Sequence, residues 1–244
     1  MHKLNFRFAA LLSLFLAGAA LADTTNSAVV PAFRTKPKFW MERHERYLQE
    51  AKQGPYDLVF LGDSITDFWH DKGSNVWNRY YAPRRALNLG IRGDLTQHVL
   101  WRIENGELDG LSPKALVLLI GTNNNGRNKT NSPPRNTPAE AIEGVARVVK
   151  EVRAKLPQTK ILLLAIFPRE DPTGPPSENI RETNEGIAKL ADGRMVTFLD
   201  INANFVDKDG RLLDGVMPDR LHPGEQGYEI WAKAMEPTLE RLLK

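Results

Sequence analysis

The stretch Tyr56-Asp57-Leu58-Val59-Phe60-Leu61-Gly62-Asp63-Ser64-Ile65-Thr66 carries an apolar run straight into a tight Gly-Asp-Ser turn. A short apolar run that is bounded by turn residues is typical of a buried strand. The turn presents the hydroxyl of Ser64, so a candidate nucleophile stands at the end of this strand. The same turn taken alone fits a structural role equally well, in which Asp63 or Ser64 only caps the next helix.

Further apolar runs recur along the chain, and segments with helical spacing separate them. After the run at 58–61, the runs that predict buried strands lie at 86–89, 115–120, 161–166 and 195–199. Apolar residues three and four apart predict helices that begin at Phe39 and that cover 96–103, 138–156, 178–191 and 224–243. Strands that alternate with helices indicate βαβ units, so we expect an α/β fold whose parallel sheet is covered by helices on both faces.

The length of 244 residues suits one large α/β domain, which two short N-terminal segments precede. Residues 1–22 have a positive start, an apolar centre and an Ala20-Leu21-Ala22 ending, the pattern of a cleavable signal peptide. The apolar part falls short of the roughly 20 residues that a membrane-spanning helix needs, which leaves an uncleaved anchor as the minor alternative. Residues 23–38 are polar, small and interrupted by prolines, and they predict a leader before a domain over 39–244.

Composition narrows the classes of function. The chain has no cysteine, so it makes no disulfide bonds and lacks the residue that a lipid-modified export signal requires. Loss of Lys3 and Arg7 with the signal peptide lowers the formal net charge from +3 to +1. A nearly neutral chain gives no electrostatic reason to bind nucleic acid or an acidic bilayer. We therefore expect a periplasmic or secreted protein with no nucleic-acid partner and no stable membrane anchoring.

A second chemically notable motif, Pro218-Asp219-Arg220-Leu221-His222-Pro223, lies near the other end of the chain. A serine hydroxyl needs a base within hydrogen-bond reach and a third group that orients the base. Ser64, His222 and Asp219 supply these three groups, because the offset of three residues lets the carboxylate bind one imidazole nitrogen while the other faces Ser64. Taken alone, Asp219 and His222 fit a surface turn with a solvated ion pair better than catalysis.

The predicted topology brings these residues to one place. Parallel α/β sheets bind ligands beyond the carboxyl ends of their strands, where several loops meet. Ser64 follows the first strand, Gly90 the second and Asn123 the third, and the segment with His222 follows the last. We therefore expect all of them on the same rim of the sheet.

Three groups in this set can stabilise negative charge on a substrate carbonyl oxygen. They are the backbone N–H of Ser64, the backbone N–H of Gly90 and the side-chain amide of Asn123. Considered singly, Gly90 fits a turn glycine and Asn123 a cap at the end of a strand.

Four spaced blocks together resemble a known family. Gly62-Asp63-Ser64, Gly90, Gly121-Thr122-Asn123 and Asp219-x-x-His222 stand in the order of the SGNH, or GDSL-type, hydrolases, and the resemblance covers nearly all of 56–244. The stretches 87–96 and 119–124 are most similar to the catalytic subunits of the intracellular platelet-activating-factor acetylhydrolases and their bacterial relatives.

The resemblance implies a flavodoxin-like, three-layer sandwich with a central parallel sheet of about five strands. It implies Ser64 as the nucleophile, Asp219 and His222 as the rest of the triad, Gly90 and Asn123 in the oxyanion hole, and no metal or organic cofactor. Two positions depart from the family pattern, because Arg92 stands where those acetylhydrolases usually have glycine and Asn124 where many members have aspartate.

Further candidates for contact with the substrate are Asp63, Arg92 and Trp69. Aromatic rings can line a groove for a sugar or an acyl group, although tryptophan is usually buried. His70 and His98 lack the paired spacing of zinc ligands, so we expect no metal site.

These features predict an exported serine carboxylic ester hydrolase that resembles an acetylesterase. We expect it to cleave short acyl esters, above all acetyl, from a small ester or an acetylated carbohydrate through a Ser64-linked acyl-enzyme. A lipid-directed acyl hydrolase and a non-catalytic glycan-binding domain are the alternatives. The oligomeric state stays open, with a homodimer as one option.

Overall fold

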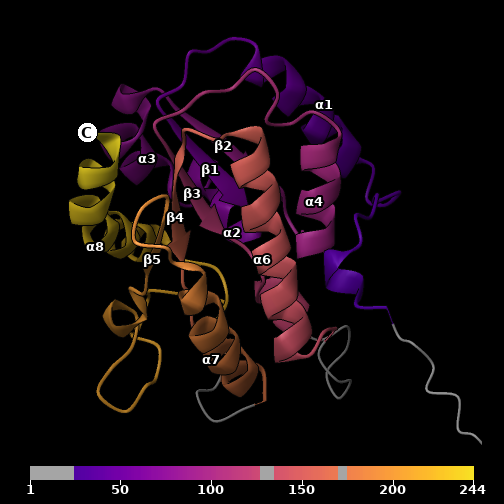
Figure 1. Cartoon of the computed structure of the whole chain (residues 1–244). Helices are drawn as coiled ribbons and strands as arrows, with labels where there is room; N and C mark the ends of the chain where they lie inside the picture. The colour runs from indigo at the N-terminus through magenta and orange to yellow at the C-terminus, as the bar shows by residue number, and fades with distance from the viewer. Residues whose placement is uncertain (1–24, 127–134, 170–174) are drawn as a thin grey trace, which may run out of the picture.

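The computed structural model describes residues 25–126, 135–169 and 175–244. At its centre lies one parallel sheet of five strands in the order β2-β1-β3-β4-β5 (Figure 1). The strands are β1 (Leu58–Gly62), β2 (Ala86–Gly90), β3 (Ala115–Leu119), β4 (Lys160–Leu164) and β5 (Val196–Leu199). The prediction of an α/β fold with a parallel central sheet of about five strands is confirmed.

Eight α-helices precede, connect or follow these strands in the described parts of the chain. They are α1 (Phe39–Ala51), α2 (Ser64–Asp67), α3 (Ser74–Tyr80), α4 (Thr96–Glu104), α5 (Thr122–Asn125), α6 (Pro138–Lys155), α7 (Pro175–Ile187) and α8 (Glu225–Leu243). Short 3₁₀ turns add η1 (Ser27–Val29), η2 (Phe68–His70), η3 (Ala82–Arg84), η4 (Ala188–Leu190) and η5 (Asn202–Asn204). The long helices begin and end close to their predicted limits, whereas α2, α3 and α5 are too short to show a helical period.

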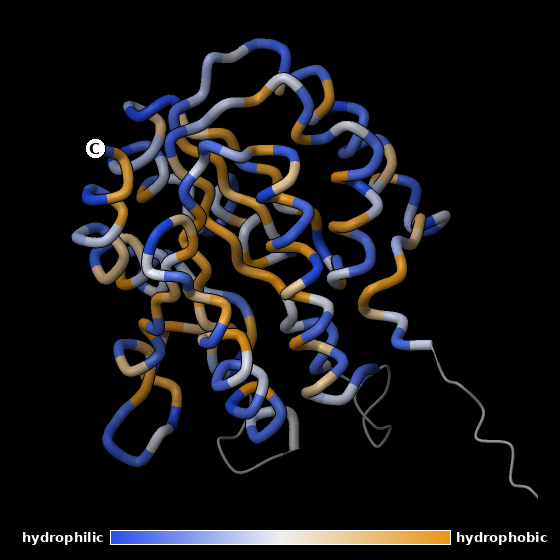
Figure 2. The backbone as a smooth tube through the Cα atoms, in the orientation of Figure 1, coloured by the Kyte–Doolittle hydropathy of each residue, from blue (hydrophilic) through white to orange (hydrophobic). Residues whose placement is uncertain are grey.

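The two faces of the sheet pack against different helices, which gives the three layers. Successive strand residues point to opposite faces. Val59 and Leu61 belong to a buried cluster that includes residues of α1, α4, α6 and α7. Leu58 and Phe60 belong to a second cluster, which includes residues of α3 and α8. Figure 1 shows these two sets of helices on opposite sides of the sheet, and Figure 2 shows the strands between them as mainly hydrophobic.

The register of the sheet decides where its loops emerge. Gly62 at the end of β1 pairs with Gly90 at the end of β2 and with Leu119 at the end of β3. The segments that follow these three residues therefore leave the sheet at the same rim, beside one another. This is the rim on which the sequence places the candidate site.

The predicted leader, residues 23–38, packs against the domain from residue 26 onward. The side chain of Asn26 caps η1 and donates to the Glu143 carboxylate of α6 at 2.8 Å. Ala28 is fully buried, and its carbonyl accepts a hydrogen bond from the Thr96 hydroxyl of α4 at 2.8 Å. We expected structure to begin near Phe39, and these contacts correct that expectation.

The predicted signal peptide, residues 1–22, lies outside the described residues. Among the residues that the structure does describe, none of the helices combines the length and the apolar character that crossing a membrane requires.

Candidate active site

Ser64 is the first residue of α2, directly after β1 and its cap. Asp63 caps the helix, since its Oδ1 accepts the backbone N–H of Ile65 at 3.0 Å. Gly62 is required before the cap, because a Cβ atom there would lie 2.3 Å from both the Leu119 carbonyl oxygen and the Thr66 hydroxyl. Strand β1, the glycine at position 62 and the cap by Asp63 together fix where the Ser64 hydroxyl points.

The loop before α8 brings His222 to this hydroxyl. The Ser64 Oγ and His222 Nε2 atoms lie 2.9 Å apart, and His222 Nδ1 lies 2.8 Å from Asp219 Oδ2. The other carboxylate oxygen of Asp219 accepts the backbone N–H groups of Leu221 at 3.1 Å and of His222 at 2.7 Å. The structure thus brings the three predicted residues into one hydrogen-bonded chain, and the Asp219 carboxylate shapes the loop as well as orienting the ring.

The environment of Asp219 favours its charged form. Partial burial acts against the charge, but the hydrogen bonds from the His222 backbone and imidazole outweigh it and hold the pKa of Asp219 well below its usual range. Lys72 adds an ion pair of 3.4 Å to the same carboxylate. The group that orients the imidazole is therefore an anion throughout the neutral pH range.

Aromatic and cationic side chains surround the imidazole. The ring of Phe68 meets the His222 ring edge to face, with 5.0 Å between their centroids. The Arg92 guanidinium lies over the same Phe68 ring at 4.5 Å, and its Nε donates to Asp67 Oδ2 at 2.6 Å. Arg43 contacts the other oxygen of Asp67. Phe68 was not among the predicted site residues, and its place directly after the short helix α2 was the only signal for it.

Gly90 does not offer its N–H to the site, which corrects the prediction for this residue. The Gly90 N–H donates to the side-chain oxygen of Asn88 at 2.9 Å, while the Asn88 amide donates to the Thr66 carbonyl at 2.9 Å. Asn88 in this way ties β2 to α2. Glycine is required at position 90 for space, because a Cβ atom would lie 2.2 Å from the Asp67 nitrogen.

Gly93 offers a backbone N–H that the sequence analysis missed. Its φ of 77° lies in the left-handed region that favours glycine. Neither the Gly93 N–H nor the Ser64 N–H has an acceptor among the described residues. The second glycine of Asn88-Leu89-Gly90-Ile91-Arg92-Gly93-Asp94 was the available signal for this group in the sequence.

Asn123 lies next to this turn, as predicted, at the start of α5. Its side-chain amide donates to the Asp94 carbonyl at 2.8 Å, which leaves the second amide hydrogen for another acceptor. The neighbouring Asn124 is fully buried and supports the turn from behind, since its Oδ1 accepts the Thr96 N–H at the start of α4 at 3.1 Å. The departure at position 124 therefore affects a supporting contact and not Ser64, Asp219 or His222.

Two residues predicted to contact substrate lie in the interior instead. Trp69 is fully buried among Phe60, Tyr228 and Trp231, so it cannot line an open groove. Asp63 is also fully buried, because it caps α2, and its burial raises its pKa to about 7. Of the three candidates, Arg92 alone has an exposed side chain.

A buried ionic cluster supports the two strands that carry the site. Arg102 is fully buried and donates to the carbonyls of Leu89 at 2.9 Å and Gly62 at 3.2 Å. Its charge is balanced by Glu107 and by Asp94, whose Oδ2 lies 2.9 Å from Arg102 Nε. A buried guanidinium with several partners fixes positions strongly, because removing one member leaves an uncompensated charge.

The other two histidines near the rim, His70 and His98, have packing and hydrogen-bond roles within the fold. His98 accepts the Leu95 N–H at 3.0 Å at the start of α4, and burial together with nearby arginines lowers its pKa to about 3. His70 packs edge to face against Trp77. In the described ranges, no three histidine or acidic side chains gather as a metal site would require.

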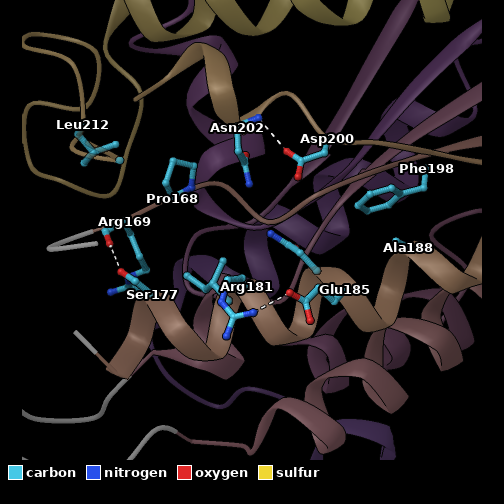
Figure 3. Close-up of a pocket in the computed structure, with 13 residues that line it drawn as sticks. Pro168, Arg169, Ser177, Arg181, Glu185, Ala188, Phe198, Asp200, Asn202 and Leu212 are labelled. Carbon is cyan, nitrogen blue, oxygen red and sulfur yellow. Dashed lines mark hydrogen bonds and ion pairs between the residues drawn. The ribbon is translucent and has the colours of Figure 1, made fainter. Parts of the chain in front are cut away.

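A cavity of about 480 Å³ lies farther along the rim, at the ends of β4 and β5 against α7 (Figure 3). Its walls include Arg169, Phe198, Asp200 and Leu212, and none of the three triad residues lines it. Arg169 also donates to the Thr122 carbonyl at 3.2 Å, next to Asn123. The cavity is thus separate from the triad, and Arg169 connects the two parts of the rim.

Comparison with known proteins identifies the family. Residues 60–230 match the model of the GDSL-like lipase/acylhydrolase family, and the chain belongs to this family of esterase-type and acylhydrolase-type enzymes. The predicted family is thereby confirmed.

Named relatives support this assignment. The chain is 37% identical over 205 residues to human platelet-activating factor acetylhydrolase IB subunit alpha1, with 84% of each chain covered. It is 34% identical over 209 residues to subunit alpha2 from Rattus norvegicus, which covers 84% of this chain and 85% of the relative.

Two solved structures share the fold at lower identity. A GDSL-like lipase from Bacteroides thetaiotaomicron has a TM-score of 0.65 at 20% identity and covers 81% of this chain and 97% of its own. An acetylxylan esterase from Geobacillus stearothermophilus has a TM-score of 0.60 at 20% identity and covers 76% of this chain and 93% of its own.

Proposed function

We propose that this protein is a serine esterase that hydrolyses short acyl esters, above all acetyl esters, through a Ser64-linked acyl-enzyme. The observation that carries the proposal is the hydrogen-bonded chain from Ser64 Oγ through both nitrogens of His222 to the Asp219 carboxylate. A nucleophile, a base and a group that orients the base are the set that acyl transfer needs.

The reaction proceeds in two halves. His222 Nε2 takes the proton of Ser64 as Oγ attacks the ester carbonyl carbon, and the same proton then passes to the leaving alkoxide as the ester C–O bond breaks. Water next attacks the acyl-enzyme and gives a proton to His222, which returns it to Ser64 Oγ as the acid is released. Asp219 stays charged and holds the imidazole in the tautomer that accepts from Ser64.

Negative charge on the carbonyl oxygen needs donors that are already in place. We assign this role to the backbone N–H of Ser64, the backbone N–H of Gly93 and the side-chain amide of Asn123. The first two groups have no acceptor among the described residues, and the amide keeps one hydrogen beyond its bond to the Asp94 carbonyl. Gly93 replaces Gly90 in the set because the Gly90 N–H is occupied by Asn88.

The acyl group is proposed to be short. The names of similar proteins support this choice, since one set of relatives is named acetylhydrolase and a structural neighbour is named acetylxylan esterase. The signal-peptide pattern at 1–22 supports export, and outside the cytoplasm an acetylated carbohydrate or similar small ester is the substrate we favour. The relatives named for platelet-activating factor make a lipid ester the second candidate.

The decisive experiment combines hydrolysis of p-nitrophenyl acetate with a Ser64→Ala variant and a fluorophosphonate label. We expect label on Ser64 in the wild type and loss of turnover in the variant. Wild-type turnover in Ser64→Ala would remove the nucleophile from the proposal. Glycan binding with neither hydrolysis nor labelling would favour the non-catalytic alternative.

A series of esters from acetyl to decanoyl then separates the two substrate classes. A rate that falls steeply beyond propionyl supports a small acyl site. A rate that rises with chain length supports a lipid-directed enzyme.

A further inference from the structure

Arg92 presents a partly exposed guanidinium over the Phe68 ring, which in turn contacts the His222 imidazole. Its Nε is bound to Asp67 Oδ2 at 2.6 Å, and 46% of its side chain is exposed. The two terminal nitrogens of Arg92 have no acceptor in the parts of the chain that the structure describes. A guanidinium with a free planar fork is the group that best matches a carboxylate or a phosphate.

The Phe68 ring connects Arg92 to His222. Arg92 lies 4.5 Å and Lys72 lies 5.0 Å from the centroid of Phe68, whose ring contacts the His222 imidazole at 5.0 Å. Two cations therefore lie against an aromatic ring that contacts the His222 imidazole. Phe68 also limits how far the Arg92 side chain can swing, because its ring supports the guanidinium from one side.

The charged side chains around Arg92 leave a net positive charge there. One carboxylate, Asp67, is shared by two guanidinium groups, Arg43 and Arg92. Lys72 is balanced by Asp219, which also has to balance His222 whenever the imidazole is protonated. The Arg34 guanidinium donates to the Arg92 carbonyl at 2.9 Å, but it is paired with the Asp94 carboxylate at 3.3 Å and so adds no unbalanced charge. An anion next to Arg92 is thus favoured by the sum of these charges as well as by the fork.

We propose that Arg92, assisted by Lys72, binds an anionic group, a carboxylate or a phosphate, on the alcohol part of the ester. The proposal rests on the proposed function. We place the anionic group on the alcohol part because His222 delivers its proton to the leaving alkoxide. The groups around the imidazole therefore face the alcohol and not the acyl chain. The substrate class is then a short acyl ester of an acidic alcohol, such as an acidic sugar or a phosphorylated polyol.

The test uses two substrates that differ mainly in charge, 3-acetoxybenzoate and 3-acetoxybenzamide. The measured quantity is the ratio of their kcat/KM values. We expect the ratio to fall about tenfold in Arg92→Gln, the loss typical of one charge-assisted contact at a partly exposed site. Arg92→Lys keeps the charge but lacks the planar fork, so its ratio should lie between those of the wild type and Arg92→Gln. Added salt should lower the wild-type ratio, since it screens the exposed charges.

Arg147→Gln is the matched control. Arg147 lies on α6 with 41% of its side chain exposed, and its Nε is bound to the Glu151 carboxylate at 2.7 Å, as Arg92 is to Asp67. The ratio should be the same in this variant as in the wild type. Replacing the benzoate by 3-acetoxyphenyl phosphate in the same series shows which of the two anions Arg92 prefers.

The outcomes separate this proposal from the proposed function. If the wild type hydrolyses both esters in a Ser64-dependent way and Arg92→Gln leaves the ratio unchanged, the anion site is wrong and the esterase stands. If turnover persists in Ser64→Ala, the esterase mechanism itself fails. Thermal unfolding of each variant identifies misfolding. If Arg92→Gln is misfolded, the ratio measured for Arg92→Lys decides instead.

Discussion

The hydroxyl of Ser64 and the imidazole of His222 are 158 positions apart in the chain and 2.9 Å apart in the structure. Strand β1 delivers the first residue and the loop before α8 delivers the second. Tyr228 of α8 also donates to the Ile65 carbonyl of α2 at 2.7 Å, so the two elements are joined by a buried hydrogen bond close to the reacting groups. The geometry of the candidate site therefore depends on the packing of α8 against α2.

The triad predicts unequal losses for its two supporting residues. His222→Ala removes the base, and we expect kcat to fall by about 10³-fold to 10⁴-fold or more. Asp219→Ala should cost less, roughly 10-fold to 100-fold, because 47% of its side chain is exposed and water can replace part of its interaction with the ring. Steady-state kinetics with p-nitrophenyl acetate measure both. An equal loss in the two variants would contradict this division.

Asn123 is predicted to act on the transition state and not on substrate binding. Asn123→Ala removes one donor to the oxyanion, so kcat should fall by about 10²-fold to 10³-fold while KM changes little. Asn123 is only partly buried, and its loss should lower the unfolding temperature by just a few degrees. A rise in KM at constant kcat would show instead that the amide holds the ground-state substrate.

Gly90 is predicted to matter for folding stability. A Cβ atom at this position would lie 2.2 Å from the Asp67 nitrogen and 2.6 Å from the Thr66 carbonyl carbon. Both are backbone atoms that cannot rotate away, so Gly90→Ala should lower the free energy of unfolding by about 2 kcal/mol or more. Urea denaturation measures the change. Unaltered stability together with a selective loss of kcat would return Gly90 to the oxyanion hole.

The buried carboxyl of Asp63 predicts a pH-dependent stability. Burial raises its pKa from 3.8 to about 7. Between these values the folded protein holds a proton that the unfolded chain has released, so stability falls as the pH rises and the full penalty is present above pH 7. Asp63→Asn keeps the capping oxygen and removes the charge. Its stability relative to the wild type should therefore increase from pH 5 to pH 8, by about 2 to 3 kcal/mol.

Urea unfolding of both proteins at the two pH values gives this difference. Ser64→Ala is the control, because it changes the neighbouring residue without removing a titrating group. A difference between Asp63→Asn and the wild type that is the same at pH 5 and pH 8 would show that Asp63 is charged in the folded state.

Sequence patterns anticipated those parts of the site that depend on local backbone geometry. The apolar run before Gly62 predicted β1, and the Gly-Asp-Ser turn allowed for a cap by Asp63 or Ser64, which the structure assigns to Asp63. The offset of three residues between Asp219 and His222 was enough to predict their contact, because a tight turn brings such residues together. Short range and a fixed backbone period make these predictions possible.

Contacts between distant elements were beyond the same reasoning. Whether the Gly90 N–H faces the site or Asn88 depends on the rotamer of a neighbouring side chain, and periodicity does not encode that choice. Trp69 has the aromatic side chain that a substrate groove often uses, yet the packing of α8 against it buries the ring. The polar sequence of residues 23–38 predicts only a leader before the domain, and its contacts with α4 and α6 exist only in the folded chain.

The amino-acid sequence by itself determined the order of the strands and long helices, their shared rim and the three residues proposed as a triad, because each follows from periodicity, turn chemistry or the direction of parallel strands. Only the tertiary structure decided which backbone N–H groups remain open, and that the Phe68 ring contacts both the Arg92 guanidinium and the His222 imidazole. The physical reason is that hydrogen-bond partners and ring contacts between distant segments exist only after the sheet has brought those segments together.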